Sequence, residues 1–444
     1  MPAHRQRCEK GLIMEKKTTC SISRRSFAKA VASVAGMAAL SRSARAADQK
    51  KNTIRIGWVG SGDRGAADVR FCMEADENVE LVAIADIFPD RVEAALNRLR
   101  GKLSDRVKVT KDTTFTGFDA YKKILEMPEV DLVFLTTSPN FRPQQFREAI
   151  QAGKHCFVEK PGAVDPVGVR SLLETTETAR KKNLSVVVGM QQRWMPQYQE
   201  IVKRVQDGAI GDIRHVGAYW IGQMMTWHWI SRESAKSDLE WQLRAWPQFT
   251  WTSGDCCVEQ LVHNLDVSNW VLGSTPLAVR GLGGRIVRLG PKYGNIYDNF
   301  SFDFDYPGGL KGLGMNAQIE GVADRVCNTM NGSKGDAYVT RGGAYINSDK
   351  ARWEYSGPTD GDRPMHKAMC EGIRKGEPVN QGRILAEATM TGILGRESAY
   401  TGQPLTWKWI MGESKLDLTP KQELSFDKPF PVPPVPMPGQ TKPV

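Results

Sequence analysis

Short apolar runs alternate with helical stretches through the first half of the chain. We expect strands at residues 54–59, 81–85, 107–109, 131–135, 155–158 and 186–190. Between them the pattern predicts helices at residues 66–73, 89–100, 119–127 and 143–152. Strands and helices that alternate at this spacing form βαβ units around a parallel sheet. The first half is therefore predicted to be a doubly wound α/β domain.

The second half has a different pattern. Apolar and polar residues alternate strictly at 300–306, which is typical of a half-buried strand, and further strands are expected at 309–318 and 336–340. A late helix is predicted over residues 384–400. A large sheet with a helix after it indicates an α+β domain.

One predicted helix in this half carries ionisable side chains. Asp255 is a plausible N-cap and Gly273 a plausible C-terminal stop. Glu259, His263 and Asp266 then stand at i, i+4 and i+7, on one face of the helix. A carboxylate next to an imidazole fixes its tautomer and raises its basicity, so Glu259 is expected to orient His263.

The first predicted strand leads into a glycine-rich turn. Gly60, Gly62 and Gly65 form a GxGxxG pattern between a strand and a helix, the context that a pyrophosphate cradle requires. Asp86 follows the second strand, where an acid hydrogen-bonds the adenine ribose and repels a 2′-phosphate. These residues predict a dinucleotide site that binds NAD.

The N-terminus accounts for most of the net charge of +10. Residues 1–46 hold ten Lys and Arg and two acidic residues, so about +2 remains for the rest, and nucleic-acid binding is not expected. Arg24 and Arg25 precede a mildly apolar run and a small-residue cleavage site at 44–46. We interpret residues 1–46 as a twin-arginine signal peptide, with Met1 or Met14 as the start. The mature protein is then periplasmic and is not held in a membrane.

Cysteine and histidine spacings do not predict a metal site. The six cysteines after residue 46 include no CxxC pair, and the usual ligand clusters are missing. Cys156 and Cys256 lie in apolar contexts and are expected in the core.

A tripeptide after the fifth strand points to a family. Glu159-Lys160-Pro161 follows residues 155–158, and with the glycine motif and Asp86 it resembles the Gfo/Idh/MocA family, relatives of glucose–fructose oxidoreductase and inositol dehydrogenase. The resemblance extends from about residue 53 to residue 402. It implies a Rossmann domain at 47–190 and a C-terminal α+β domain with a large open, mostly antiparallel sheet at 191–402. The Pro-rich tail at 403–444 is expected to be extended, draped over a partner subunit.

The resemblance also implies a catalytic set. Lys160 would stabilise an alkoxide, His263 would act as general base and acid, and Glu259 would orient it. The chain departs from the family pattern in three places: Glu259 replaces the usual Asp, Leu261 stands where Gly is common, and the loop at 139–143 lacks a His that many members carry. The departures leave the cofactor prediction intact and bear on the substrate.

The predicted contacts fall into two sets. The residues expected to bind NAD are Gly60, Gly62, Asp63, Arg64, Gly65, Asp86, Thr137, Asn140, Glu159 and Lys160. The residues expected to touch substrate are Arg193, Trp227, His228, Asp266 and Tyr297. Six of the 12 tryptophans fall within residues 219–251, and tryptophan stacks well on the C–H faces of sugars, although most of these rings are expected to serve packing.

Three functions fit this set of residues. The first is an oxidoreductase that moves a hydride between a sugar or polyol carbon and a tightly bound NAD that is reset in the same site. The second is a glycosidase or lyase that oxidises a sugar hydroxyl transiently and releases an aglycone. The third is a non-catalytic sugar-binding protein that retains the nucleotide. The family resemblance implies a homodimer or homotetramer formed through the open sheet.

Overall fold

A six-stranded parallel sheet occupies the first part of the chain in the computed structural model, which describes residues 52–223 and 229–444. Its strand order is β3-β2-β1-β4-β5-β6. The strands are β1 (Ile54–Val59), β2 (Val79–Asp86), β3 (Thr114–Thr116), β4 (Leu132–Leu135), β5 (His155–Val158) and β6 (Val186–Val188). The order reverses between β1 and β4, and ligands of such sheets bind at this switch point, beyond the carboxyl ends of the strands.

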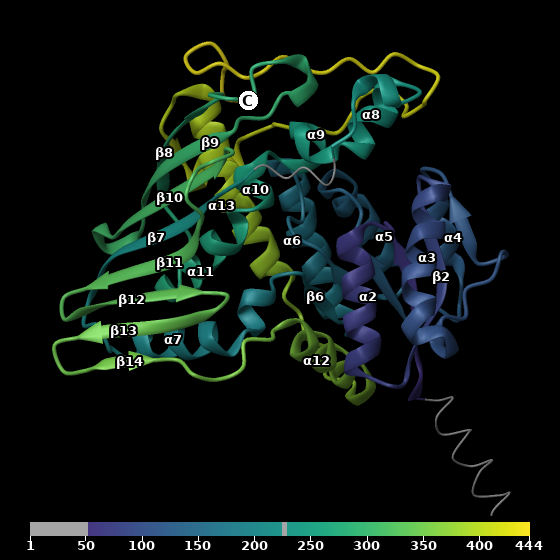
Figure 1. Ribbon diagram of the computed structural model, residues 1–444, viewed down its shortest axis with the longest axis horizontal. Helices are drawn as coiled ribbons and strands as arrows, with labels where there is room; N and C mark the ends of the chain where they lie inside the picture. The colour runs from purple at the N-terminus through teal and green to yellow at the C-terminus, as the bar shows by residue number, and fades with distance from the viewer. Residues whose placement is uncertain (1–51, 224–228) are drawn as a thin grey trace, which may run out of the picture. The chain divides into compact units, whose positions relative to one another are not determined.

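Helices connect these strands (Figure 1), and the alternating pattern predicts the first four of them but not the fifth. They are α2 (Asp63–Ala75), α3 (Pro89–Leu103), α4 (Ala120–Glu126), α5 (Arg142–Gln151) and α6 (Pro166–Lys181). Local sequence sets their starts: α6 begins with Pro166 at N1, and the Asp165 carboxylate accepts a hydrogen bond from Gly168 N at 2.6 Å. The central strands β1 and β4 to β6 are almost wholly apolar because helices cover both faces of a parallel sheet.

The strand expected at residues 107–109 is the one error in this sheet. Val107 forms only an isolated bridge with Leu81, and the ladder partner of β2 is Thr114–Thr116. Val107 and Val109 are buried in the core although they lie outside the sheet. Their apolar character therefore results from burial and not from strand pairing.

A nine-stranded sheet forms the second part, in the order β14-β13-β12-β11-β7-β10-β9-β8-β15. Its pairs are antiparallel apart from β7 with β10, which confirms the predicted fold class. The strands are β7 (Ile213–Gly222), β8 (Ala278–Gly284), β9 (Asn299–Asp305), β10 (Lys311–Gln318), β11 (Arg325–Gly332), β12 (Gly335–Thr340), β13 (Gly343–Ser348), β14 (Arg352–Glu354) and β15 (Leu405–Thr406).

Helices cover one face of this sheet and leave the other face open (Figure 1). They include α7 (Pro196–Gln206), α10 (Cys256–Glu259), α11 (Val262–Leu272) and α13 (Gly382–Thr401), whereas α12 (Asp362–Lys375) packs on α2 of the first part. The alternation in β9 places Phe300, Phe302 and Phe304 on the covered face, where all three are buried.

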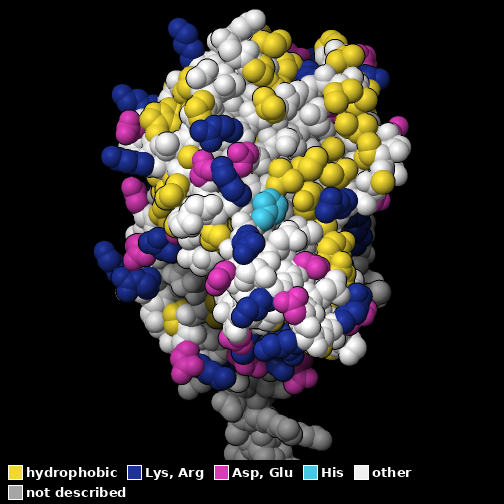
Figure 2. All heavy atoms as spheres, turned by 90° about the vertical axis from the view of Figure 1, so that its left-hand side faces the viewer, with side chains coloured by type: hydrophobic (Ala, Val, Ile, Leu, Met, Phe, Trp, Pro, Cys, Tyr) yellow, Lys and Arg dark blue, Asp and Glu magenta, His cyan; other side chains and the backbone are white. Residues whose placement is uncertain are grey.

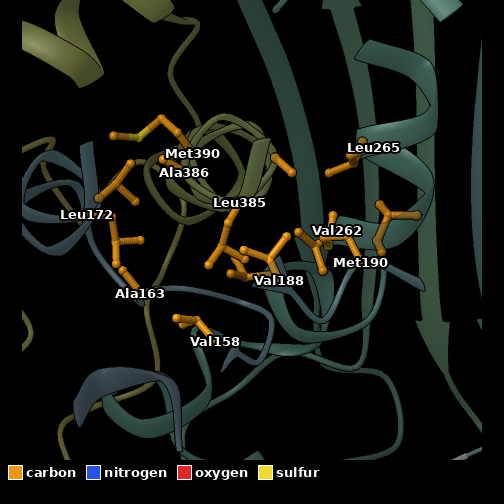
Figure 3. Close-up of a cluster of buried hydrophobic side chains, with 14 of the residues drawn as sticks. Val158, Ala163, Leu172, Val188, Met190, Val262, Leu265, Leu385, Ala386 and Met390 are labelled. Atoms are coloured by element: carbon orange, nitrogen blue, oxygen red, sulfur yellow. The ribbon is translucent and has the colours of Figure 1, made fainter. Parts of the chain in front are cut away.

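Helix α13, the predicted late helix, joins the two parts. Figure 3 shows Leu385, Ala386 and Met390 of α13 among side chains from β5, β6 and α11. The Thr389 hydroxyl accepts a hydrogen bond from Gly162 N at 3.1 Å. One buried core therefore spans both sheets and fixes the Rossmann crevice relative to the second domain.

The C-terminal tail lies on its own chain. It is not extended throughout, since residues 405–412 form β15 and α14 (Trp407–Gly412). Further on, Phe430 packs on Trp251 at 5.2 Å between ring centroids, and its carbonyl accepts a hydrogen bond from Gln242 at 2.7 Å. The ring of Phe426 stacks on Phe88, beside Asp86, at 5.9 Å. These tail residues therefore dock on their own chain, close to Asp86.

The predicted signal peptide lies outside the described residues. Within the described part of the chain, the longest apolar helices still fall short of what a membrane span requires.

His366 in α12 provides a test of this packing. Its ring lies 4.9 Å from Phe157 and 5.7 Å from Phe134, and neither nitrogen has a hydrogen-bond partner among the described residues. Burial lowers the pKa of His366 to about 3. Below about pH 6.5 the imidazole of His366 is protonated in the unfolded chain but stays neutral in the native protein. The free energy of unfolding therefore falls as the pH drops from about 6.5 toward 3.

We predict that His366→Leu flattens this acid dependence. The wild-type free energy of unfolding should lose up to about 1.4 kcal/mol per pH unit to this residue within that window, and the variant should lose less. Urea unfolding at a series of pH values measures both slopes. Equal slopes in the two proteins would contradict the assigned burial.

Candidate active site

The glycine-rich turn at the end of β1 has three different environments. Gly60 has φ +87°, and a Cβ there would lie 2.4 Å from Thr137 N. A Cβ on Gly65 would lie 2.3 Å from the Thr136 hydroxyl and 2.8 Å from the Gly60 carbonyl. A Cβ on Gly62 would have no neighbour within 4 Å. The fold itself therefore requires Gly60 and Gly65, whereas Gly62 keeps a path open for a close-lying ligand, as a pyrophosphate cradle does.

Asp86 lies at the carboxyl end of β2, next to this turn. Its carboxylate accepts hydrogen bonds from Ser61 N at 2.6 Å, the Ser61 hydroxyl at 3.0 Å and Phe88 N at 2.9 Å. It lines a cavity of about 110 Å³. The other walls are Gly60, Gly62, Ile87, Phe88, Arg91, Thr136, Thr137, Ser138, Phe141, Leu243, Arg244 and Trp246. An anchored carboxylate beside apolar walls fits the ribose and adenine of a dinucleotide.

A second cavity, of about 380 Å³, continues from the glycine turn toward the second domain. We call it the central cavity. It is lined by Gly62, Asp63, Arg64, Gly65, Thr136, Thr137, Ser138, Arg142, Glu159, Lys160, Gln191, Trp220, Trp246, Glu259, Gln260, His263 and Arg341. The predicted catalytic residues and the predicted phosphate cradle thus share one cavity.

Lys160 and Glu259 form an ion pair across the central cavity. The Lys160 Nζ lies 2.6 Å from both the Glu259 Oε1 and the Glu259 carbonyl oxygen. The two side chains are 13% and 12% exposed, so the pair is largely screened from water. Each charge is therefore held by the other and faces the cavity rather than bulk solvent.

The prediction that Glu259 orients His263 is wrong. Residues 255–273 do not form one helix: α10 ends at Glu259, α11 begins at Val262, and Gln260 between them has φ −104° and ψ −56°. The Glu259 carboxylate binds the Lys160 ammonium instead. A full positive charge at 2.6 Å is a stronger partner for a carboxylate than a neutral imidazole. Asp255 and Gly273 do cap the two ends as expected.

His263 is a buried, uncharged imidazole. Its ring stacks on Trp220 at 5.7 Å between centroids with the planes 22° apart, and Nδ1 has no hydrogen-bond partner among the described residues. Burial lowers the pKa of His263 well below its usual value, and the charges of Lys160, Arg341 and Arg64 act in the same direction. Neutral imidazole can accept a proton from a bound hydroxyl.

Arg64 ties the glycine turn to the Glu-Lys-Pro turn. It contacts Asp68 at 2.7 Å, Glu159 at 2.9 Å and Asp362 at 3.0 Å. The Glu159 carboxylate also accepts a hydrogen bond from Lys160 N at 2.8 Å. Arg64 and Glu159 line the central cavity as predicted, but their charged groups hold one another, so they shape the cradle.

The remaining predicted cofactor residues differ in position. Asp63 and Thr137 line the central cavity, with Asp63 paired to Arg98 and the Thr137 hydroxyl bonded to Gln145 at 2.7 Å. Asn140 lies in the 3-10 turn η2 (Pro139–Phe141) and interacts with the Ser138 hydroxyl. It lines neither cavity, contrary to the prediction of a cofactor contact.

The described members of the predicted substrate set lie away from the central cavity. Arg193 and Asp266 bind each other through two hydrogen bonds of 2.7 and 2.8 Å, with the guanidinium over Trp270. Tyr297 is buried against Tyr400 and donates to the Pro436 carbonyl at 2.8 Å. None of these three predicted contacts lines the central cavity, which corrects the prediction. Trp227 and His228 lie outside the described residues.

Several residues of the central cavity escaped the sequence analysis. Trp220 and Trp246 belong to the Trp-rich segment, where the sequence alone does not distinguish packing rings from cavity walls. Gln260 occupies the helix break that the apolar pattern conceals. Arg341 lies in the turn between β12 and β13, and only the strand pairing brings it to the cavity. Within the described residues no group of His, Cys, Asp or Glu side chains could hold a metal ion.

Two family models match most of the region that forms these sites. Residues 54–190 match the oxidoreductase family with an NAD-binding Rossmann fold, and residues 198–338 match the Gfo/Idh/MocA C-terminal domain. The chain belongs to the Gfo/Idh/MocA family. Membership confirms the resemblance drawn from the Glu-Lys-Pro tripeptide and shows that residues 54–190, which include Gly62 and Asp86, form an NAD-binding Rossmann domain.

Relatives within the Gfo/Idh/MocA family carry different names. Glycosyl hydrolase family 109 protein 1 of Bacteroides fragilis is 25% identical over 243 residues, 52% of this chain and 48% of the relative. Inositol 2-dehydrogenase of Rhizobium meliloti is 24% identical over 285 residues, 64% of this chain and 74% of the relative. The chain thus spans about half the length of the Bacteroides relative.

Solved structures of the family share the fold. Aldose-aldose oxidoreductase from Caulobacter crescentus superposes with a TM-score of 0.64 at 17% identity, over 80% of this chain and 99% of that one. Levoglucosan dehydrogenase, in complex with NADH and levoglucosan, gives 0.63 at 16% identity over the same shares.

The glycine environments predict a contrast between two substitutions. Gly62→Ala should change the free energy of unfolding of the NAD-free protein by no more than about 1 kcal/mol, because the new methyl group meets no protein atom and the change costs only a weaker N-cap of α2. The substitution should nevertheless abolish NAD retention. Gly65→Ala should destabilise the fold by about 1–3 kcal/mol, because the methyl group collides with Thr136 and Gly60. Thermal unfolding and the NAD released on denaturation measure the two effects. Undiminished NAD in Gly62→Ala would contradict the assigned cradle.

Proposed function

We propose that this chain is an NAD-dependent oxidoreductase acting on a sugar or polyol. A hydride moves between the substrate carbon that bears a hydroxyl group and a tightly bound NAD that is reset in the same site. The observation that carries the proposal is the meeting of Lys160, Glu259 and His263 in a cavity continuous with the glycine cradle. The inositol dehydrogenase relatives and the aldose-aldose oxidoreductase neighbour support a polyhydroxylated substrate.

Each of the three side chains has a defined task in this reaction. Bound NAD supplies the hydride acceptor and donor. The Lys160 ammonium, held at 2.6 Å by Glu259, stabilises the negative charge that develops on the substrate oxygen. His263 is neutral and receives the hydroxyl proton. Glu259 positions Lys160, in place of the expected role toward His263.

Tight retention of NAD is supported by the cover over Asp86. Leu243, Arg244 and Trp246 form one wall of the Asp86 cavity, and they belong to α8 (Asp238–Arg244) and the 3-10 turn η5 (Trp246–Gln248). This wall packs in one hydrophobic cluster with Phe430 of the tail. A cofactor beneath it leaves only when the wall and the tail move.

A second candidate is cleavage of a glycoside through transient oxidation. The relatives named glycosyl hydrolase family 109, and the alpha-N-acetylgalactosaminidase of Shewanella oneidensis at 27% identity over 180 residues, favour it. A ketone formed at one carbon acidifies the neighbouring C–H, and loss of that proton to a base expels the aglycone, which takes up a proton and leaves as its alcohol. A hydrolase then adds water to the resulting double bond, whereas a lyase keeps it, and in both cases the hydride returns to the ketone. The same three side chains serve this sequence. A third candidate, sugar binding without catalysis, lacks an observation in its favour.

Export and assembly are further parts of the proposal. Arg24 and Arg25 before an apolar run support export by the twin-arginine pathway, which carries proteins that are already folded. NAD would then be bound before export and would have no free pool to exchange with afterwards. Figure 2 shows hydrophobic side chains gathered on the open face of the second sheet, and Leu282 there is 73% exposed. A homodimer or homotetramer formed through this face would cover them.

One experiment separates the candidate reactions. The purified mature protein is denatured to quantify its NAD, and the native protein is then mixed with sugars, polyols and aryl glycosides while absorbance at 340 nm is followed. Reduction that stalls until a carbonyl acceptor is added supports the oxidoreductase. Aglycone release without an acceptor supports glycoside cleavage. No response to any compound from NAD-loaded protein would overturn both.

Lys160→Met and His263→Gln should each lower turnover about 100-fold or more while the bound NAD remains at the wild-type amount, because both groups act on the substrate oxygen. Turnover with the best substrate and NAD content are the measurements. Arg280→Gln, on the open face of the sheet, is the control and should keep both. Equal loss of NAD and of turnover would instead assign Lys160 to cofactor binding.

Phe430→Ala should release NAD faster than the wild type. Removing the ring forfeits about 3 kcal/mol of tail docking and loosens the wall over Asp86. The fraction of NAD that remains after timed gel filtration measures retention. Met437→Ala, at an exposed tail position, is the matched control. Identical retention in both variants and the wild type would show that the tail does not hold the cofactor.

A further inference from the structure

Arg341 enters the central cavity from the turn between β12 and β13. Its guanidinium carbon lies 5.4 Å from the centroid of the Trp220 ring. The same Trp220 ring stacks on His263 at 5.7 Å. Arg341 and His263 therefore both contact the Trp220 ring and line the same cavity.

Some of the basic side chains that line the central cavity form ion pairs with carboxylates, whereas Arg341 forms none with the described residues. Arg64 contacts three carboxylates and Lys160 contacts Glu259. Arg341 forms no ion pair within the described part of the chain. With its amide oriented to satisfy both neighbours, Gln191 accepts one hydrogen bond from Arg341 at 3.3 Å. Most of the guanidinium's donors are thus left to face the cavity.

We infer that Arg341 binds an anionic group on the substrate, a carboxylate or a sulfate, so that the preferred substrate is an acidic sugar. The inference rests on the proposed function and names its substrate class. The planar guanidinium fork matches the oxygens of such groups and binds them through two parallel hydrogen bonds. The cofactor phosphates have their own cradle at Gly62 and the start of α2, so they do not require Arg341.

The position also serves the reaction. The charge of Arg341 is one of three that oppose protonation of His263. An anion bound to the guanidinium cancels that charge, so His263 becomes a better proton acceptor when an acidic sugar is in place. Binding and proton transfer are thereby coupled through one side chain.

The test compares paired sugars on the NAD-loaded protein. Methyl glucoside and methyl galactoside are titrated beside their uronic-acid counterparts and their 6-sulfates, with binding followed by tryptophan fluorescence. Inorganic sulfate at low ionic strength is a separate probe of the anion site. The variants are Arg341→Gln, Arg341→Lys and the control Arg325→Gln, whose guanidinium stacks on Tyr219 at 3.6 Å on the open face of the same sheet.

We expect the wild type and Arg325→Gln to bind an acidic sugar about 10- to 100-fold more tightly than its neutral partner, as hydrogen bonds to a charged group allow. Arg341→Gln should abolish that ratio, and Arg341→Lys should restore part of it, with NAD content unchanged throughout. Equal affinity for acidic and neutral sugars in the wild type would overturn the inference.

Two further outcomes separate its failure from that of the proposed function. Loss of NAD in Arg341→Gln would assign the guanidinium to the cofactor and overturn the inference alone. If no sugar reduces the bound NAD and none binds, the proposed function fails, and the binding of inorganic sulfate then tests the anion site separately. Sulfate binding that disappears in Arg341→Gln supports the site. Sulfate binding that persists in Arg341→Gln shows that Arg341 does not form it.

Discussion

The contact between the Lys160 ammonium and the Glu259 carboxylate is the interaction on which the site depends. Lys160 follows β5 of the Rossmann sheet, and Glu259 ends α10 of the second domain, so the pair joins the two halves across the central cavity. Two nearly buried charges are stable there because each compensates the other, and removal of either would leave an unpaired charge. Arg64 and Glu159 extend the network to the glycine turn. The network thereby links the end of α10, four residues before His263, to the glycine turn.

Local signals in the sequence predicted one half of the site. Gly60, Gly62, Gly65 and Asp86 act through the backbone turn and strand end to which they belong, so their roles follow from a short stretch of sequence. The parallel order of the first sheet followed in the same way from the alternation of apolar runs. The wrongly predicted strand at residues 107–109 shows where this reasoning fails, because a buried segment outside the sheet has the same apolar pattern as a paired strand.

The other half depends on contacts between distant segments. The helical pattern at 255–273 is continuous in sequence, yet the helix is interrupted between α10 and α11, and the Glu259 carboxylate binds Lys160. Arg193 and Asp266 looked like substrate contacts because each is polar near a motif, but they neutralise each other. Arg341 carries no local signal, since strand pairing alone delivers it. At position 259 relatives are expected to have Asp, and this chain has the longer Glu. Its carboxylate is the one that forms the ion pair with Lys160.

The position of the nicotinamide ring can be determined in a crystal structure of the mature protein with NADH bound. We expect the ring in the central cavity, with Lys160 and His263 on one side of it and room for a substrate carbon about 3–4 Å from its C4. A nicotinamide that lies outside this cavity, or a Lys160 that leaves Glu259 to bind elsewhere, would contradict this expectation.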